Sequence, residues 1–148
     1  MAPSRLGESM PPQLIAALIS LQIVAFGWRL NREITQADNR RITWLPLPDY
    51  LNLASLLAVV TVCVIMPATG ALAPRAANTA LSVAYVLIAF HPINEAAHYR
   101  LLFSKEGRTI YRKMGRDIPW VTDQEIFTVI ISAVLAAIAG CETWHSIR

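Results

Sequence analysis

The chain has 148 residues and a formal net charge of +3; 55% of its residues are hydrophobic and only 16% are charged. Average soluble domains carry about 25% charged residues. Together with the mean hydropathy of +0.43, this shortage of charge argues against a soluble or disordered protein. The length fits a single domain, residues 1–148, and we expect no nucleic-acid partner.

Four apolar stretches predict membrane-spanning helices, each of which needs about 20 mostly apolar residues. The uncharged runs are Ser9–Trp28, Leu51–Pro74, Ala76–Asn94 and Ile126–Cys141. We place the spans at about 11–28, 50–70, 77–94 and 124–144. A soluble bundle helix keeps a polar face, which stretches such as LASLLAVVTVCVIM lack. The sequence therefore predicts an all-α integral membrane protein, a bundle of four transmembrane helices.

The first span is expected to be retained, because its border at Trp28 and Arg29 resembles a membrane interface and not a cleavage site. Beyond it, three apolar residues fall on one helical stripe: Leu30, Ile34 and Ala37. This spacing predicts that the helix continues as an amphipathic extension on the cytoplasmic side of the membrane.

Local signals mark the starts of the second and fourth spans. Pro46 and Pro48 predict an extended stretch, after which Asp49 is expected to cap the second span. The TDQE motif, Thr122–Glu125, matches a capping box in front of the fourth span.

Basic residues are concentrated in the two long loops, 29–49 and 95–123, and are sparse in the short loop and the termini. Positive charge beside a span stays cytoplasmic, so both loops are predicted inside and both termini on the non-cytoplasmic side. The implied location is a bacterial inner or plasma membrane. We expect lipid-headgroup contacts, with anionic lipids in particular, from Arg100, Lys105, Arg108, Arg112, Lys113 and Arg116.

Polar and small residues within the spans indicate how the helices pack. Gln22 and Asn52 are expected to find partners inside the bundle or to line a pathway, because an unsatisfied amide is costly in hydrocarbon. Small residues that allow close helix contact recur at four-residue spacing: Ala16 and Ser20, Ala54 and Ala58, and Ser132, Ala136 and Gly140.

The segment HPINEAAH holds the candidate metal ligands, His91, Glu95 and His98. In an unbroken helix these residues share one stripe, and imidazole and carboxylate groups suit zinc, iron or manganese. Pro92 favours a different interpretation, in which a new helical segment starts there, His91 leaves the stripe and the third span ends in a kinked exit. No other cofactor is indicated.

Recognisable enzymatic motifs are absent from the sequence, and we do not expect an enzyme. Cys63 and Cys141 form no CxxC pair, and there is no phosphate-binding lysine loop, dinucleotide loop or serine elbow. The sequence favours an accessory, structural or interaction subunit of a membrane assembly, either a homo-oligomer or part of a larger complex. Two alternatives stay open: a small transporter or oligomeric channel, and a membrane metalloprotein that uses the Glu95–His98 segment.

Overall fold

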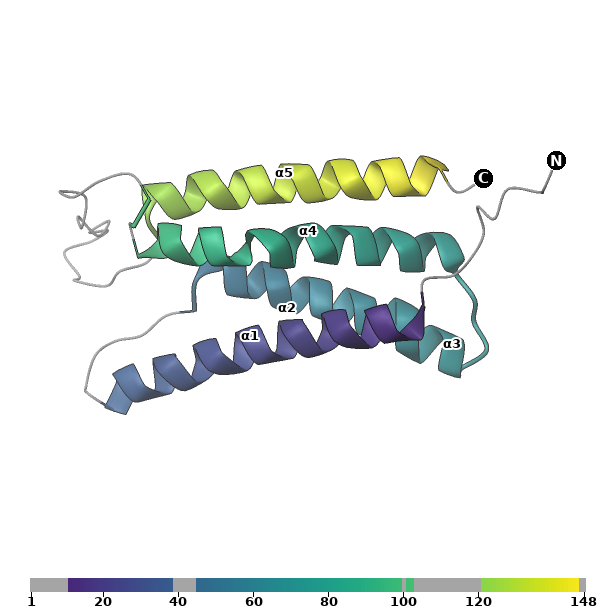
Figure 1. Cartoon of the computed structure of the whole chain (residues 1–148), viewed down its shortest axis with the longest axis horizontal. Coiled ribbons are helices and arrows are strands. Elements are labelled where there is room, and N and C mark those ends of the chain that lie inside the picture. The colour runs from purple at the N-terminus through teal and green to yellow at the C-terminus, as the bar shows by residue number, and fades with distance from the viewer. Residues whose placement is uncertain (1–10, 39–44, 100, 103–120, 147–148) are drawn as a thin grey trace.

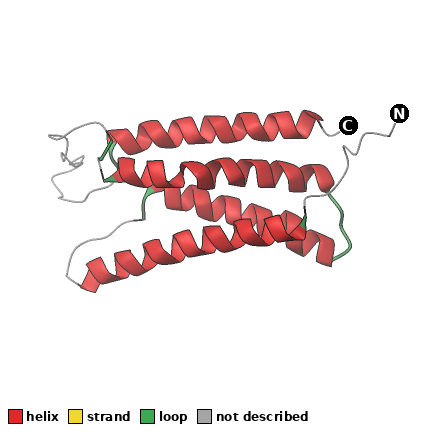
Figure 2. Ribbon diagram, viewed as in Figure 1, coloured by secondary structure: helices red, strands yellow, loops and turns green. Residues whose placement is uncertain are grey.

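The computed structural model describes residues 11–38, 45–99, 101–102 and 121–146, which form helices and connecting turns with no strand among them (Figure 2). The elements in chain order are α1 (Pro12–Asp38), α2 (Leu47–Val60), the π-helical turn η1 (Thr61–Ile65), α3 (Met66–Ala68), α4 (Pro74–His98) and α5 (Asp123–Ser146). Because α2, η1 and α3 follow without a break, they make one rod. The described residues therefore contain four helices long and apolar enough to cross a membrane, as the sequence predicts.

The helices pack in the order α1, α2, α4, α5, with α1 and α5 at opposite edges of the bundle (Figure 1). Helices α1 and α4 finish at the end where α2 and α5 begin. We call this the charged end, because it holds Arg29, Asp49, Glu95 and Glu125. At the opposite end, α1 and α4 begin and α5 finishes.

Helix α2 starts earlier than its two prolines suggest. It begins at Leu47, so Asp49 lies inside the first turn and does not cap the helix, and the prediction of an extended stretch through Pro48 is wrong. Proline is tolerated in a first turn because its missing N–H has no partner within the helix there. The Leu47 N–H, at the start of the helix, donates instead to a side chain of α5, Glu125 Oε1, at 2.8 Å.

The turn η1 widens the rod just before Pro67. The Met66 N–H donates to the carbonyl of Thr61, five residues back, in place of the usual four. In a regular helix the Pro67 ring would collide with the carbonyl of Cys63, so a wider turn accommodates the proline. The rod ends after Ala68, and Gly70 then adopts a φ of 81°, which glycine allows without steric cost.

Helix α4 runs through Pro92 to His98 without restarting. The prediction of a new helical segment at Pro92 is therefore wrong, and the helix continues four residues beyond residue 94, where the third span was predicted to end. His91, Asn94 and Ala97 are buried along this last part of the helix.

Helix α5 begins with the predicted capping box. Thr122 Oγ1 accepts a hydrogen bond from the Glu125 N–H at 3.0 Å, and Glu125 Oε2 accepts one from the Thr122 N–H at 3.3 Å. The reciprocal pair satisfies two backbone donors that the helix itself cannot.

Small residues bring α5 against α4, as predicted for the fourth span. Ser132, Ala136 and Gly140 are all buried, and a Cβ on Gly140 would lie 3.0 Å from Val83 Cγ2. The corresponding predictions for the first two spans are wrong, since the residues are exposed: Ala16, Ser20, Ala54 and Ala58. There the contact is made by larger apolar side chains, with Leu18 of α1 and Val59 of α2 in the core.

Helix α1 continues to Asp38, in agreement with the predicted extension of the first span. Leu30 and Ile34 are exposed on it, and the side chain of Ala37 lies outside the described residues.

Candidate functional site

Uncharged polar side chains link the helices within about two helical turns of the residues at the charged end. Gln22 Nε2 donates to Asn52 Oδ1 at 3.1 Å and to Ser55 Oγ at 2.7 Å, which joins α1 to α2. Asn94 Nδ2 donates to Ser132 Oγ at 3.1 Å, which joins α4 to α5. The structure thus brings together Gln22 and Asn52, the two amides singled out from the sequence.

Arg29 is the centre of the charged end and is only 1% exposed. Its Nε lies 3.2 Å from Asp49 Oδ2 and 3.4 Å from Glu95 Oε2, and its Nη1 donates to the Tyr99 hydroxyl. The Arg29 guanidinium, on α1, therefore contacts Asp49 on α2. At the end of α4 it contacts the Glu95 carboxylate and the Tyr99 phenol. Such a planar group suits several directed contacts at once.

The ring of Tyr99 lies close to two arginines. Its ring centroid is 5.2 Å from the guanidinium carbon of Arg29 and 4.1 Å from that of Arg32. Burial raises the pKa of the Tyr99 phenol, whereas the hydrogen bond from Arg29 and the two positive charges act in the opposite direction. With its pKa raised, the phenol stays protonated at neutral pH, and its oxygen accepts the hydrogen bond from Arg29.

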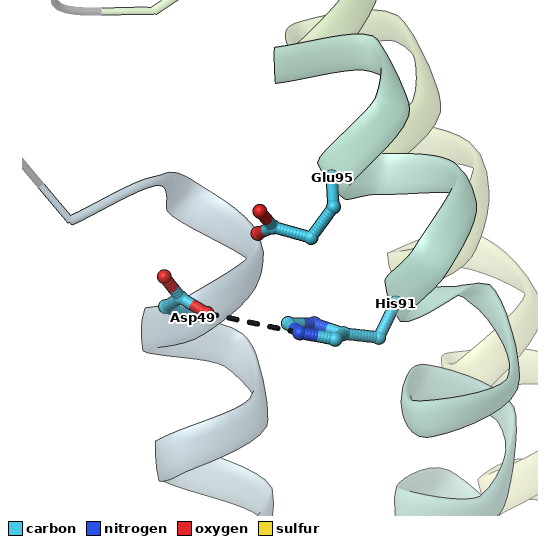
Figure 3. Close-up of side chains that lie close together, drawn as sticks. All are labelled: Asp49, His91 and Glu95. Atoms are coloured by element: carbon cyan, nitrogen blue, oxygen red, sulfur yellow. Dashed lines mark ion pairs between the residues drawn. The ribbon is translucent and has the colours of Figure 1, made fainter. Parts of the chain in front are cut away.

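Three potential metal ligands converge beside Arg29. Asp49 from α2, and His91 and Glu95 from α4, point toward one another (Figure 3), and one ligand atom from each lies within 4.8 Å of the other two. His91 Nε2 is 3.8 Å from Asp49 Oδ1. Asp49 is fully buried, and His91 is 8% exposed.

A second carboxylate, Glu125, ties three helices together. Besides the Leu47 N–H, it contacts His98, whose Nδ1 lies 2.8 Å from Glu125 Oε2. Thr122 Oγ1 donates to the Ala97 carbonyl at 2.8 Å, and so adds a second contact between α4 and the start of α5.

The predicted metal set changes in the structure. His91 and Glu95 lie together, but His98 turns to Glu125, and Asp49 takes its place. Arg29 was expected at a membrane interface and Asp49 at a helix cap, so neither was foreseen as part of a site. The topology offered one signal. In an antiparallel bundle of four helices, the ends of the spans next to the two long loops lie at the same end of the bundle. Each of these span ends carries a charged residue, so the charges could have been expected to lie close together.

Charge is sorted along the bundle. The buried charged side chains of the described residues, Arg29, Asp49 and Glu125, are all at the charged end, and the buried polar residues farther in are uncharged. The six basic residues expected at lipid headgroups lie outside the described residues. No family model, curated protein or solved structure matches the chain, so its function must be inferred from these residues.

Proposed function

We propose that the chain is a multi-pass membrane protein that acts as an accessory or interaction subunit of a membrane assembly. In this proposal the bundle holds two basic loops on the cytoplasmic face, where they bind an acidic surface of the partner. The observation that carries the proposal is that buried polar contacts fix the ends of both loops at the charged end.

The segment from Arg29 to Asp49, which contains the last part of α1 and the connection to α2, is held at its two ends by the pair of Arg29 and Asp49, whose Nε and Oδ2 atoms are 3.2 Å apart. Both side chains are almost fully buried, which makes the contact different from an exposed salt bridge of little energetic value. Removing Arg29 would take the cation away from the buried Asp49 carboxylate, a change that typically costs about 3–5 kcal/mol.

The loop between α4 and α5 is closed by three contacts. His98 Nδ1 lies 2.8 Å from Glu125 Oε2, Thr122 Oγ1 donates to the Ala97 carbonyl, and the Leu102 N–H donates to Gln124 Oε1 at 3.3 Å. The two loop bases are also tied to each other, through Glu125 to Leu47 and through Arg29 to Glu95.

This arrangement favours a fixed support over a carrier. A carrier that alternates between two faces must move its helices against each other, and buried ion pairs that cross three helices oppose such movement. The amides that could line a pathway, Gln22 and Asn52, are instead hydrogen-bonded to each other. The loops carry most of the positive charge of the chain, which suits electrostatic attraction of an acidic partner.

The test is gentle extraction of the full chain in mild detergent, followed by measurement of complex stoichiometry. We expect a defined complex that contains a second membrane protein, and loss of that protein when loop charge is removed by Arg108→Gln, Arg112→Gln and Lys113→Gln together. Arg75→Gln, at the opposite end, is the matched control and should retain the complex. A second measurement is ion flux across the membrane of liposomes that contain the purified chain. Flux that is abolished by Gln22→Leu would contradict the proposal and support a channel.

Orientation is tested separately by labelling single cysteines at positions 75 and 112 in a variant whose Cys63 and Cys141 are replaced by serine. Position 112 should react only from the cytoplasmic side and position 75 only from the other side. The reverse result would place the loops outside and remove the cytoplasmic partner from the proposal.

A further inference from the structure

We propose that Asp49, His91 and Glu95 form a binding site for one divalent transition-metal ion of the Mn²⁺, Fe²⁺ or Zn²⁺ class. The site does not depend on the subunit role proposed above. It differs from the set that the sequence suggests, because α2 supplies a carboxylate in place of His98.

The distances are close to those of a metal site. In tetrahedral coordination, with bonds of about 2.0–2.2 Å to nitrogen and oxygen, neighbouring ligand atoms are roughly 3.3–3.6 Å apart. His91 Nε2 and Asp49 Oδ1 are already 3.8 Å apart, and the whole set lies within 4.8 Å (Figure 3).

Burial leaves polar atoms of this set without hydrogen bonds. Neither carboxylate oxygen of Glu95 accepts a hydrogen bond from the described residues, and the Nδ1 of the buried His91 has no partner among them. Among the described residues, the Glu95 carboxylate has one ion pair, with Arg29 Nε at 3.4 Å from Oε2. A buried carboxylate without donors is costly, and a bound cation would supply the missing contact.

Arg29 fits outside the ligand set. It faces Asp49 Oδ2 and Glu95 Oε2, whereas Asp49 Oδ1 is the oxygen that faces His91. Two carboxylates and one guanidinium give this group a net formal charge of −1, which attracts a cation. The guanidinium also holds both carboxylates in orientation, as groups around metal ligands commonly do.

The donor set selects the kind of metal. One imidazole and two carboxylates suit Mn²⁺, Fe²⁺ and Zn²⁺, whereas Ca²⁺ and Mg²⁺ prefer oxygen ligands alone and copper(I) prefers sulfur. Three protein ligands leave at least one coordination position for water or another small ligand.

The experiment titrates the full chain in detergent with Mn²⁺ or Zn²⁺ after treatment with EDTA. Elemental analysis should find one ion per chain, and Mn²⁺ should show an electron paramagnetic resonance signal with nitrogen coupling from one imidazole. Bound metal should also raise the melting temperature. No uptake by the wild-type chain would overturn the proposal.

Variants identify the ligands. His91→Ala and Glu95→Gln should each weaken binding by about 30-fold or more, consistent with the effect of disturbing a metal site, and should abolish the rise in melting temperature. Asp49→Asn is not needed for the conclusion, because it also removes the partner of Arg29 and can prevent folding.

His145→Ala is the matched control, since it removes an exposed histidine from the opposite end, and it should change affinity by less than about 3-fold. His98→Ala distinguishes the proposed ligand set, which does not include His98, from the set that the sequence suggests, which does. If binding is lost in His98→Ala or His145→Ala and kept in both His91→Ala and Glu95→Gln, the proposed site is wrong.

Discussion

At the charged end, α1, α2 and α4 meet through the side chains of Arg29, Asp49 and Glu95, whereas at the opposite end α4 and α5 meet through Gly140 and a pair of hydroxyls. There Thr143 Oγ1 donates to Ser82 Oγ at 2.8 Å, and α5 approaches Val83 closely. One end is thus held by a few directed charged contacts and the other by close packing.

The difference follows from the free-energy cost of placing charged or uncharged polar groups in a membrane. Charged groups are expensive in hydrocarbon, but less so near the headgroups, where the charged end of these spans would lie. Amides and hydroxyls in transmembrane bundles contribute only about 0.6 kcal/mol each on average, so they can lie deeper without much effect on stability. We expect mutations to be costly at the charged end and mild elsewhere, which four experiments can test.

The largest effect is expected from Arg29→Leu. It leaves Asp49 and Glu95 buried beside each other without their cation, so the free energy of unfolding should fall by about 3–5 kcal/mol. Unfolding titrations in mixed detergent and SDS micelles would measure it. The exposed Arg75→Leu is the control and should change stability by less than about 0.5 kcal/mol. Equal effects of the two would show that the charged end is not special.

Glu125→Gln should have the next largest effect. A glutamine has one acceptor oxygen in place of two, so it cannot accept from both the Leu47 N–H and the Thr122 N–H, and about 2 kcal/mol should be lost in the same titration. Glu142→Gln is matched to it, because Glu142 is exposed at the other end of the same helix. A stability loss in Glu142→Gln as large as that in Glu125→Gln would contradict the assignment.

Gln22→Leu probes the uncharged hydrogen bonds between α1 and α2. It removes the hydrogen bonds to Asn52 and Ser55, and we expect a loss of about 1–2 kcal/mol, because amide contacts in transmembrane bundles are weak. Gln13→Leu, on the exposed start of α1, should have no measurable effect on the unfolding midpoint. A loss larger than that in Arg29→Leu would reverse the order proposed for the two regions.

The smallest effects compare two glycines. Gly27→Ala should stabilise the chain by about 0.5–1 kcal/mol, because nothing lies within 4 Å of the added Cβ and alanine is the better helix former. Gly140→Ala should lose that gain, since its Cβ would lie 3.0 Å from Val83 Cγ2. Thermal unfolding of both variants side by side would measure the difference, and an equal gain in the two would mean that α4 and α5 do not pack closely there.

The spans could be read from the sequence because hydrocarbon length and uncharged runs are properties of the chain alone. The capping box at Thr122–Glu125 was also predictable, as both of its hydrogen bonds are local. Pro48 and Pro92 were misjudged for a shared reason. The rules disfavour proline in a helix on average, whereas a first turn and a well-packed helix both tolerate it.

The site could be predicted only in part. Glu95 and His91 lie close together, as expected for an unbroken helix, because they are one turn apart on α4. Asp49 and Arg29 come from helices whose rotation and depth are decided by packing, which a single sequence does not encode in its local pattern. Each had an ordinary local explanation, as a cap and as an interface residue, and those explanations hid their contact.

Pro92 gives the proposed metal site a particular mechanical property. A proline has no N–H, so the helical ladder lacks one hydrogen bond between Pro92 and the carbonyl of Ile88. His91 lies within the turn that lacks this bond, and Glu95 lies in the next turn. The turn that carries His91 is therefore held by one backbone hydrogen bond fewer than a regular helical turn, which lowers the cost of a small shift of the imidazole toward an ion.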